Sequence, residues 1–501
     1  MQPSSPTSHG YSTAGANPVR SNLVKPGRFG LMFPELAIVP WTTGDLARDD
    51  QVAVELGNAM HAHSSQAPGT IPAGFTYFGQ FVDHDITFDP TSMGENAVDV
   101  GDLVNFRTPA LDLDSLYGSG PRDQPFLYRR DSGGTASQFL IGPIVQVPGT
   151  ADAHEVALAG ASYDLPRACD GLGERTAILG DKRNDENLIV AQLHRTMLHF
   201  HNAVCLHMPE LSFADVRKRV IHHYQRILLN EFLPLIVGQQ ALDKALNRRE
   251  FYKIGPGELA TSPYIPLEFS GAAYRFGHSM VRSSYHFNRV FPPGTDFRLV
   301  FSFTGDGGFF GLPRYPSNWL LDWRQFFPGL GTSPQMAMPI DASLSDQLII
   351  GPPLGGTALA TLNLRRSFLH YKLPSGQAVA ARMGLPAIDS AVLETGVGGD
   401  VIKKFNIGSQ TPLWYYLLRE AEISTGAQHL GPIGAAIVAE VFVGLLQDDP
   451  ESVLCAPTPS LLSVDQPFKI ADLFNFVESK KGQGNIPKAG VINPLETPLP
   501  F

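Results

Sequence analysis

The chain has 501 residues, of which 43% are hydrophobic and 31 are phenylalanine, enough for a large buried core. Its 38 Lys and Arg residues against 48 Asp and Glu residues give a net charge of −10, which argues against nucleic acid as the main partner. The three cysteines (Cys169, Cys205 and Cys455) are far apart, fit no zinc spacing and cannot form a disulfide framework.

The two ends of the chain differ in composition from the middle. Residues 1–22 are polar, rich in Ser, Pro and Gly, and lack the apolar core of a secretory signal. We predict a disordered arm over 1–26, one large domain over 27–486 and an extended, Pro-rich tail over 487–501. The longest apolar stretch, 431–446, contains Glu440 and is too short to span a membrane comfortably. We therefore expect no membrane partner and a cytoplasmic location, with leaderless export left open.

The first predicted helices are residues 45–61 and 75–89. The second is mostly apolar and aromatic, yet it contains Gln80, Asp83, His84 and Asp85. Polar groups in an apolar run are costly unless each finds a partner. In a helix Gln80 and His84 share a face, and the two carboxylates point about 100° to either side of His84. The pattern predicts an imidazole facing a pocket, with two carboxylates serving different partners.

An irregular loop is expected over 105–119. It places the side-chain oxygens of Thr108, Asp112 and Asp114 at alternating positions, and hard cations such as Ca²⁺ bind several oxygens of this kind. The spacing does not match an EF-hand, and Asp-x-Asp in a loop is usually solvated. On these residues alone both readings stay open.

A long amphipathic helix is predicted from about residue 180 to 208. Arg183 and Glu186 stand three apart at its start, where a first-turn ion pair is the ordinary interpretation. His194 and His201 share a face but have no third ligand, which favours packing over metal binding. The next helical pattern, 213–245, is expected to be one long helix that Pro234 kinks.

The second half of the chain continues as helices separated by Gly- and Pro-rich connections. Small residues surround Arg275 and His278, which are three apart and share a helical face. Asn363 sits among apolar residues within a helix over 358–372 and must satisfy its amide. Further helices are predicted to begin at 373 and to cover 413–422 and 434–447. The expected class is mainly α with little β-structure.

Several of these motifs occur in one order: Gly79–Asp85, Leu113–Gly118, Gly180-Asp-x-Arg-x-x-Glu186, Arg275-Phe-Gly-His278 and Asn363. From about residue 27 to 450 the chain resembles the peroxidase–cyclooxygenase superfamily, the animal-type haem peroxidases. The absence of a signal sequence and of disulfides favours a bacterial-like member. The resemblance implies haem b held between a distal and a proximal helix, with Ca²⁺ nearby.

On the distal side, the resemblance implies three roles. His84 would take a proton from hydrogen peroxide and return it to the leaving oxygen. Arg183 would stabilise negative charge as the O–O bond breaks, and Gln80 would hydrogen-bond water or halide. On the proximal side, His278 would be the iron ligand and Asn363 would accept from its other ring nitrogen.

The haem edge and the cation complete the implied site. Arg275 would face a propionate, and Asp83 and Glu186 match carboxylates that form ester bonds to haem methyls during turnover. Asn187 stands where some members carry a haem-linked methionine, so a third link is not expected. The implied calcium ligands are a set of side chains and one carbonyl from two segments: Asp85, Thr108, Ala110 through its carbonyl, Asp112 and Asp114. The family often has serine in place of Asp114.

The function implied is a peroxidase that uses H₂O₂, through a ferryl porphyrin-radical state, to oxidise a phenol, iodide, bromide or thiocyanate. One alternative is a fatty-acid dioxygenase of the same superfamily, which uses a tyrosine three residues before the proximal histidine. Here Arg275 holds that position and Tyr274 is one step off. Another is a non-catalytic haem-binding protein, which the intact set of His84, Arg183 and His278 argues against.

Overall fold

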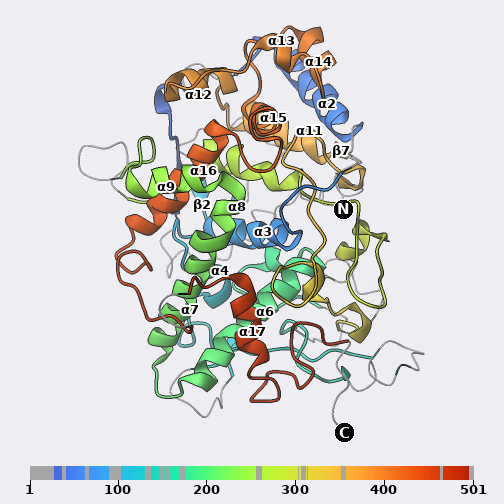
Figure 1. Cartoon of the computed structure of the whole chain (residues 1–501), viewed down its shortest axis with the longest axis vertical. Coiled ribbons are helices and arrows are strands. Elements are labelled where there is room, and N and C mark those ends of the chain that lie inside the picture. Colours follow the sequence, from blue (N-terminus) through green and yellow to red (C-terminus); the bar gives the residue numbers. More distant parts are fainter. Residues whose placement is uncertain are drawn as a thin grey trace, which may run out of the picture.

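Helices make up most of the ordered elements in the computed structural model of the chain (Figure 1). The structure describes residues 27–36, 41–62, 67–89, 103–129, 137–146, 152, 158–168, 175–254, 262–302, 304–305, 312, 314–350, 357–462 and 466–495. The predicted mainly helical class is therefore confirmed. The predicted arm over 1–26 lies outside the described residues.

Helix α3 (Gly74–Ile86) lies near the middle of the molecule, as Figure 1 shows. Its aromatic residues are fully buried, and Phe75 and Phe78 both pack against the ring of Phe232. The helix contacts α6 (Leu188–His207) on one side and the short 3₁₀ helix η7 (Ala273–His278) on another. This apolar framework fixes the polar residues that α3 carries. The preceding helix, α2 (Leu46–Ala62), matches its prediction.

Helix α6 follows the short 3₁₀ helix η5 (Lys182–Asp185). The side chain of Asn187 caps α6 by accepting from the backbone N–H groups of Ile189 and Val190, and such caps stabilise a helix start. Almost every residue of α6 is buried, and the helix packs against α3, α7 (Phe213–Ile227) and α17 (Ile470–Glu478). The helix predicted over 180–208 is confirmed from Leu188 onward, but its expected first turns form the separate helix η5.

The single helix expected over 213–245 is wrong. The segment is α7, a π-helical turn η6 (Leu228–Phe232), α8 (Leu233–Val237) and α9 (Gln239–Asn247). Pro234 has no N–H for an intrahelical bond, and the π turn just before it accommodates that loss. Gly238 then adopts φ +76°, which ends α8 and redirects the chain into α9.

Two later segments are less regular than the sequence suggested, whereas the helices predicted over 413–422 and 434–447 are present as α15 and α16. The segment around His278 consists of α10 (Leu267–Ser270) and η7, and the predicted helix over 358–372 consists of α11 (Leu359–Leu364) and the π turn η13 (Arg365–His370). The remaining helices include α12 (Gly376–Met383), α13 (Ser390–Leu393), α14 (Gly399–Phe405), α15 (Leu413–Thr425) and α16 (Pro432–Gln447). One-turn helices are α4 (Asp114–Tyr117), η2 (Pro34–Leu36), η4 (Pro125–Leu127), η8 (Phe297–Phe301), η10 (Ser317–Trp319), η11 (Trp323–Gln325) and η12 (Asp346–Leu348).

The strands are short. In one sheet β1 (Gly27–Gly30) lies between β2 (Val104–Asn105), antiparallel to it, and β3 (Ile265–Pro266), parallel to it. The other pairs are β4 (Ser284–Tyr285) with β5 (Thr295–Asp296) and β6 (Ile349–Ile350) with β7 (Thr357–Ala358). Because β3 leads directly into α10 and η7, the first sheet anchors the segment that carries His278.

The segment after α17 packs into the body, although we predicted an extended tail from residue 487. Val491 and Leu495 are buried. The backbone N–H of Trp323 donates to the carbonyl of Ile492, and the hydroxyl of Tyr163 donates to the carbonyl of Gly490. Glu478 accepts from the N–H of Val491. Residues 487–495 therefore belong to the folded domain; 496–501 lie outside the described residues.

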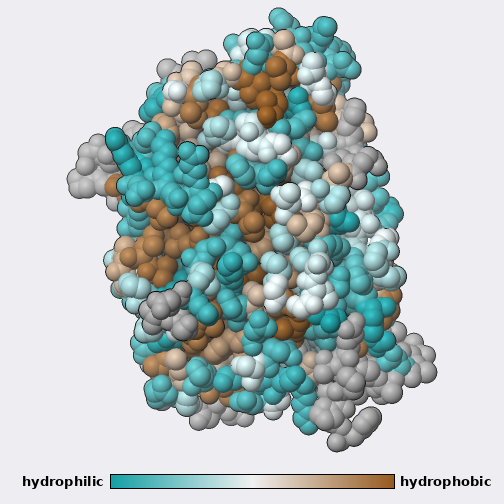
Figure 2. Space-filling view, viewed as in Figure 1, coloured by the Kyte–Doolittle hydropathy of each residue, from teal (hydrophilic) through white to brown (hydrophobic). Residues whose placement is uncertain are grey.

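The surface carries no single dominant apolar face in the view of Figure 2, where hydrophobic areas are separated by hydrophilic ones. The exposed large apolar side chains come from separate segments, among them Leu46, Phe126 and Ile423. Scattered apolar side chains of this kind are normal. Among the described helices, none combines the length and apolar character needed to cross a bilayer.

Candidate haem and cation sites

His84 lies in the last turn of α3 and is only 4% exposed. Its Nδ1 is 2.8 Å from Oδ1 of Asn184, which belongs to η5. Burial lowers the pKa of His84 below its usual range, and the positive charge of Arg183 lowers it further, while the negative charges of Glu186, Asp181 and Asp83 act in the opposite direction. Burial and Arg183 therefore favour the neutral form of the imidazole over the charged form.

Arg183 is held beside the same turn of α3. Its Nε and Nη2 donate to the carboxylate of Asp181 at 3.1 and 2.8 Å. Nη2 also donates to the carbonyls of His84, at 3.0 Å, and Thr87, at 2.6 Å, and the guanidinium lies 4.5 Å from the ring centroid of Phe88. A cation at the carbonyl end of a helix is electrostatically favourable. The two guanidinium groups of Arg107 and Arg183 outweigh burial and lower the pKa of Asp181 well below its usual range.

The other predicted distal residues converge on this region from two segments. Oε1 of Gln80 accepts from Nδ2 of Asn187 at 3.1 Å, which links α3 to the start of α6. Asp83 accepts from the hydroxyl of Thr87 at 2.9 Å and is half-buried. Glu186 directly follows η5 and is also half-buried. Gln80, Asp83 and Glu186 are thus all half-buried and belong to the segments that carry His84 and Arg183.

His278 ends the 3₁₀ helix η7, where residues three apart lie one above the other, so Arg275 and His278 do share a face. Nδ1 of His278 is 2.6 Å from Nδ2 of Asn363, and Oδ1 of Asn363 accepts from Nη1 of Arg275 at 3.2 Å. We expected Asn363 to accept from His278, but here it faces the ring with its amide nitrogen. The reason is Arg275, whose donor takes the amide oxygen.

The segments that carry His84 and His278 are joined directly. The hydroxyl of Tyr274 donates to the carbonyl of Gly79 at 3.3 Å, and its ring stacks on Phe269. A Cβ added to Gly277 would meet no atom of the described residues within 4 Å, so these residues leave open space next to His278. The arrangement therefore combines a close α3–η7 contact with free room beside the histidine that follows Gly277.

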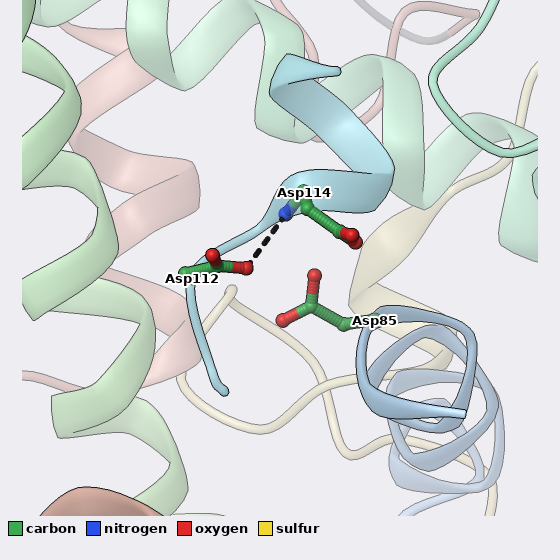
Figure 3. Close-up of side chains that lie close together, drawn as sticks. All are labelled: Asp85, Asp112 and Asp114. Atoms are coloured by element: carbon green, nitrogen blue, oxygen red, sulfur yellow. Dashed lines mark hydrogen bonds between the residues drawn. The ribbon is translucent and has the colours of Figure 1, made fainter. Parts of the chain in front are cut away.

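Three of the predicted cation ligands form a second cluster at the end of α3. Asp85 comes from α3, Asp112 from the preceding loop and Asp114 from the start of α4, and their carboxylate oxygens lie within 4.8 Å of one another. Figure 3 shows the three side chains pointing toward a common centre. Leu113, between the two loop aspartates, has φ 55°, an uncommon conformation for leucine. This local strain accompanies the convergence of its two neighbours on Asp85.

Hydrogen bonds hold the cluster in place. Asp85 accepts from the N–H of Leu113 and the hydroxyl of Ser115, both at 3.2 Å. The hydroxyl of Thr108 donates to Asp112 at 3.0 Å, while Ala110 lies half-buried in the same loop without a contact to the carboxylates among the described residues. Burial and the neighbouring carboxylates raise the pKa of Asp85 well above its usual range and that of Asp112 to about 7. A cation at the centre would relieve this mutual repulsion.

Arg107 links the two sites. Its Nη1 donates to Asp114 at 3.1 Å, and its Nη2 donates to the carbonyl of Gly180 at 3.1 Å and pairs with Asp181. Asp181 in turn holds Arg183. A continuous run of alternating charges thus extends from the acidic cluster to the distal residues.

Two residues of the site were missed from the sequence. Asp181 and Asn184 both stand within the Gly180–Glu186 motif, yet only Arg183 and Glu186 were singled out. Asp181 had a recognisable signal, because Asp commonly caps helices and here its side chain accepts from the N–H of Arg183. Asn184 had none, since nothing local distinguishes it from a solvated asparagine.

A comparison with protein families gives a match between residues 96–391 and the animal haem peroxidase model, which is more than half of the chain. The chain belongs to the animal haem peroxidase family. The resemblance noted from the motifs is therefore confirmed at family level. The matched range contains Arg183, Glu186, Arg275, His278 and Asn363, and it begins after α3.

Curated relatives in this family are distant. A peroxidase-like protein of Margaritifera margaritifera is 26% identical over 255 residues, which are 42% of this chain and 31% of that protein. Human thyroid peroxidase is 23% identical over 386 residues, 69% of this chain and 38% of that protein. The chain thus spans well under half the length of these animal haem peroxidases.

Solved structures support the same fold. Peroxidase A of Dictyostelium discoideum aligns with a TM-score of 0.58 at 17% identity, covering 87% of this chain and 89% of its own. A fatty acid alpha-dioxygenase of Oryza sativa aligns with a TM-score of 0.54 at 14% identity, covering 94% and 82%. At these identities the likeness shows the fold alone, which a peroxidase and a fatty acid alpha-dioxygenase both have.

Proposed function

We propose that this protein is a haem peroxidase that reduces hydrogen peroxide and oxidises a small phenolic, halide or thiocyanate donor. The observation that carries the proposal is a pair of polar contacts on neighbouring elements: buried His84 of α3 lies beside the fixed Arg183 of η5, and His278 of η7, which contacts α3, is bonded to Asn363. Family membership supports an oxidoreductase acting through haem.

The residues fit a haem group. Gln80, Asp83, Glu186, Arg275 and His278 are half-buried between α3, η5 and η7, and the space beside Gly277 is open. His278 would bind the iron. Arg275 would pair with a propionate, which releases Oδ1 of Asn363 and lets that amide turn to accept from His278. Haem, when bound, supplies the iron at which peroxide is reduced.

His84 and Arg183 have different roles on the distal side: His84 transfers a proton and Arg183 stabilises negative charge. The neutral imidazole of His84 accepts a proton from one peroxide oxygen and returns it to the other, so that water can leave. The guanidinium of Arg183 cannot drift, because Asp181 and two carbonyls hold it, so its charge is preorganised for the departing oxygen. Gln80, fixed by Asn187, orients water or the donor.

Stopped-flow spectroscopy tests this proposal. Protein purified with haem should show a Soret band that shifts within seconds of adding H₂O₂ and returns when a phenol, iodide, bromide or thiocyanate is supplied. Steady-state rates over this panel identify the donor class. The proposal is contradicted if the protein takes up no haem or if its haem spectrum does not change on addition of peroxide.

A fatty-acid dioxygenase is the alternative, and the position of Tyr274 argues against it. The residue three before His278 is Arg275, and the hydroxyl of Tyr274 is engaged by the carbonyl of Gly79. Oxygen uptake with palmitate would favour the dioxygenase; its absence, together with turnover of peroxide, favours the peroxidase.

We further propose that Asp85, Asp112 and Asp114, with Thr108 and the carbonyl of Ala110, bind Ca²⁺. Three converging carboxylates and a strained loop suit a hard cation that prefers oxygen ligands. The bound ion would tie the end of α3 to the loop before α4 and so steady the neighbouring His84.

Removal of calcium is expected to lower thermal stability. Binding to the folded state alone stabilises it by about 2.7 kcal/mol at a free ion concentration 100 times the Kd, so Tm should fall after chelation and recover with Ca²⁺. Asp85→Asn should abolish the recovery, while Asp400→Asn, on an exposed face of α14, should not. Calorimetry checks both, and a Tm indifferent to Ca²⁺ rejects the site.

Covalent attachment of haem through Asp83 and Glu186 is a separate proposal. After exposure to H₂O₂, acidified organic solvent should leave haem on the denatured wild-type chain and extract it from the Asp83→Asn/Glu186→Gln double variant. Protein never exposed to peroxide serves as the control. Complete extraction from peroxide-treated wild type contradicts the ester bonds without affecting the peroxidase proposal.

A further inference from the structure

The side chain of Asn184 lies between two buried imidazoles from different helices. Its Oδ1 is 2.8 Å from Nδ1 of His84 on α3, and its Nδ2 is 2.9 Å from Nδ1 of His194 on α6. Asn184 and His194 are fully buried and His84 is nearly so. One amide therefore contacts the equivalent ring nitrogen of both histidines.

The chemistry of an amide makes this contact directional. An amide oxygen only accepts hydrogen bonds and an amide nitrogen only donates them. Nδ1 of His84 must therefore carry its hydrogen, and Nδ1 of His194 must be the acceptor. A neutral imidazole carries one ring hydrogen, so Nε2 of His84 has a lone pair, whereas the hydrogen of His194 lies on Nε2. Turning the amide over would reverse both tautomers together.

The backbone around Asn184 is fixed on both sides. Arg183 is held by Asp181, and Asp185 accepts two hydrogen bonds from Arg167, at 2.6 and 2.9 Å, and one from the N–H of Gly305 at 2.9 Å. All of these side chains are buried. These contacts fix the position of the Asn184 side chain without touching the imidazole rings of His84 or His194.

We infer that Asn184 is a positioning residue whose side-chain oxygen holds His84 in the tautomer with Nε2 ready to accept a proton, while His194 holds the amide in that orientation. This inference rests on the proposed peroxidase function and deepens it. It explains why His194, which has no role toward haem or metal, is buried at this point of α6. It also places a proton-controlling residue one step along the chain from Arg183.

The test compares two variants of the haem-loaded protein at pH 8. Asn184→Leu keeps the size of the side chain but offers no acceptor, whereas Asn184→Asp keeps an oxygen facing His84. Three rates are measured: reaction with H₂O₂, binding of cyanide to ferric haem and binding of CO to ferrous haem. Peroxide and HCN must each give a proton to a base in the pocket, and CO gives none.

Asn184→Leu is expected to slow peroxide reaction and cyanide binding together by about 10- to 100-fold, the usual effect of losing a partner that orients an imidazole, with CO binding unchanged. Asn184→Asp should restore both slowed rates. Wild-type cyanide and peroxide rates in Asn184→Leu overturn the inference. Equal slowing of CO binding in both variants also overturns the inference, because it would show that Asn184 has only a structural role.

The same measurements separate this inference from the function on which it rests. If wild-type protein binds haem and cyanide but never reacts with H₂O₂, the peroxidase proposal fails. The ratio of cyanide to CO rates in the two variants still decides whether Asn184 sets the tautomer of His84.

Discussion

Replacing His84 with alanine is expected to leave haem bound and to slow the reaction with H₂O₂ by about 1000-fold or more. A positioned acid–base group typically contributes 10²- to 10⁴-fold, and His84 is the imidazole that the structure presents from α3 beside a fixed Arg183. Haem should remain because the proposed iron ligand, His278, is on another segment. Stopped-flow rates of peroxide reaction, normalised to haem content, measure the effect.

Thr76→Val is a matched control for this substitution. Thr76 is buried in the same helix, and its hydroxyl has no hydrogen-bond partner in the described part of the chain, so valine should preserve both packing and rate. Equal loss in Thr76→Val would indicate damage to α3 rather than loss of a base. An undiminished rate in His84→Ala would remove His84 from the proton chemistry altogether.

Replacing His278 with alanine is expected to abolish stable haem binding. His278 is the imidazole that the structure presents from η7, and its partner Asn363 has no means of binding iron in its place. The Soret absorbance per mole of purified protein should fall to near background. Added free imidazole should restore part of it, because the small molecule can enter the space that the side chain leaves.

His286→Ala provides the corresponding control. His286 is a half-buried histidine eight residues further along, and among the described residues its hydrogen bonds involve only its backbone. The His286→Ala variant should retain wild-type haem content. A His278→Ala protein with full haem content and an unshifted spectrum would mean that the iron is bound elsewhere.

Local patterns were sufficient for much of the helical framework. The apolar spacing of α6 and the aromatic run of α3 identify these helices because buried faces repeat with the helical period. The same pattern failed at 213–247, where Pro234 and Gly238 divide a continuous apolar face into a π turn and two short helices. The spacing of apolar residues indicates which face of a helix is buried. It does not indicate where the backbone hydrogen bonds change from the α to the π pattern.

Site residues could be predicted where they belong to a sequence motif of the family. They could not be predicted where their role depends on a contact with a residue far away in the chain. Asp85, Asp112 and Asp114 were named as one set through the family resemblance, and the structure brings them together. The direction of the Asn363 amide depends on Arg275, and the importance of Asn184 depends on two histidines 100 and 10 residues away. Such contacts arise only once the helices have packed.

The packing of residues 487–495 has a consequence for how the protein is made. The side-chain hydroxyl of Tyr163 donates to the carbonyl of Gly490, 327 residues later, and the backbone N–H of Trp323 donates to the carbonyl of Ile492, so buried residues from the middle of the chain depend on partners near residue 490. Contacts so distant in sequence form late and slowly. The parts of the core around Tyr163 and Trp323 can therefore be completed only after residues 487–495 have been synthesised.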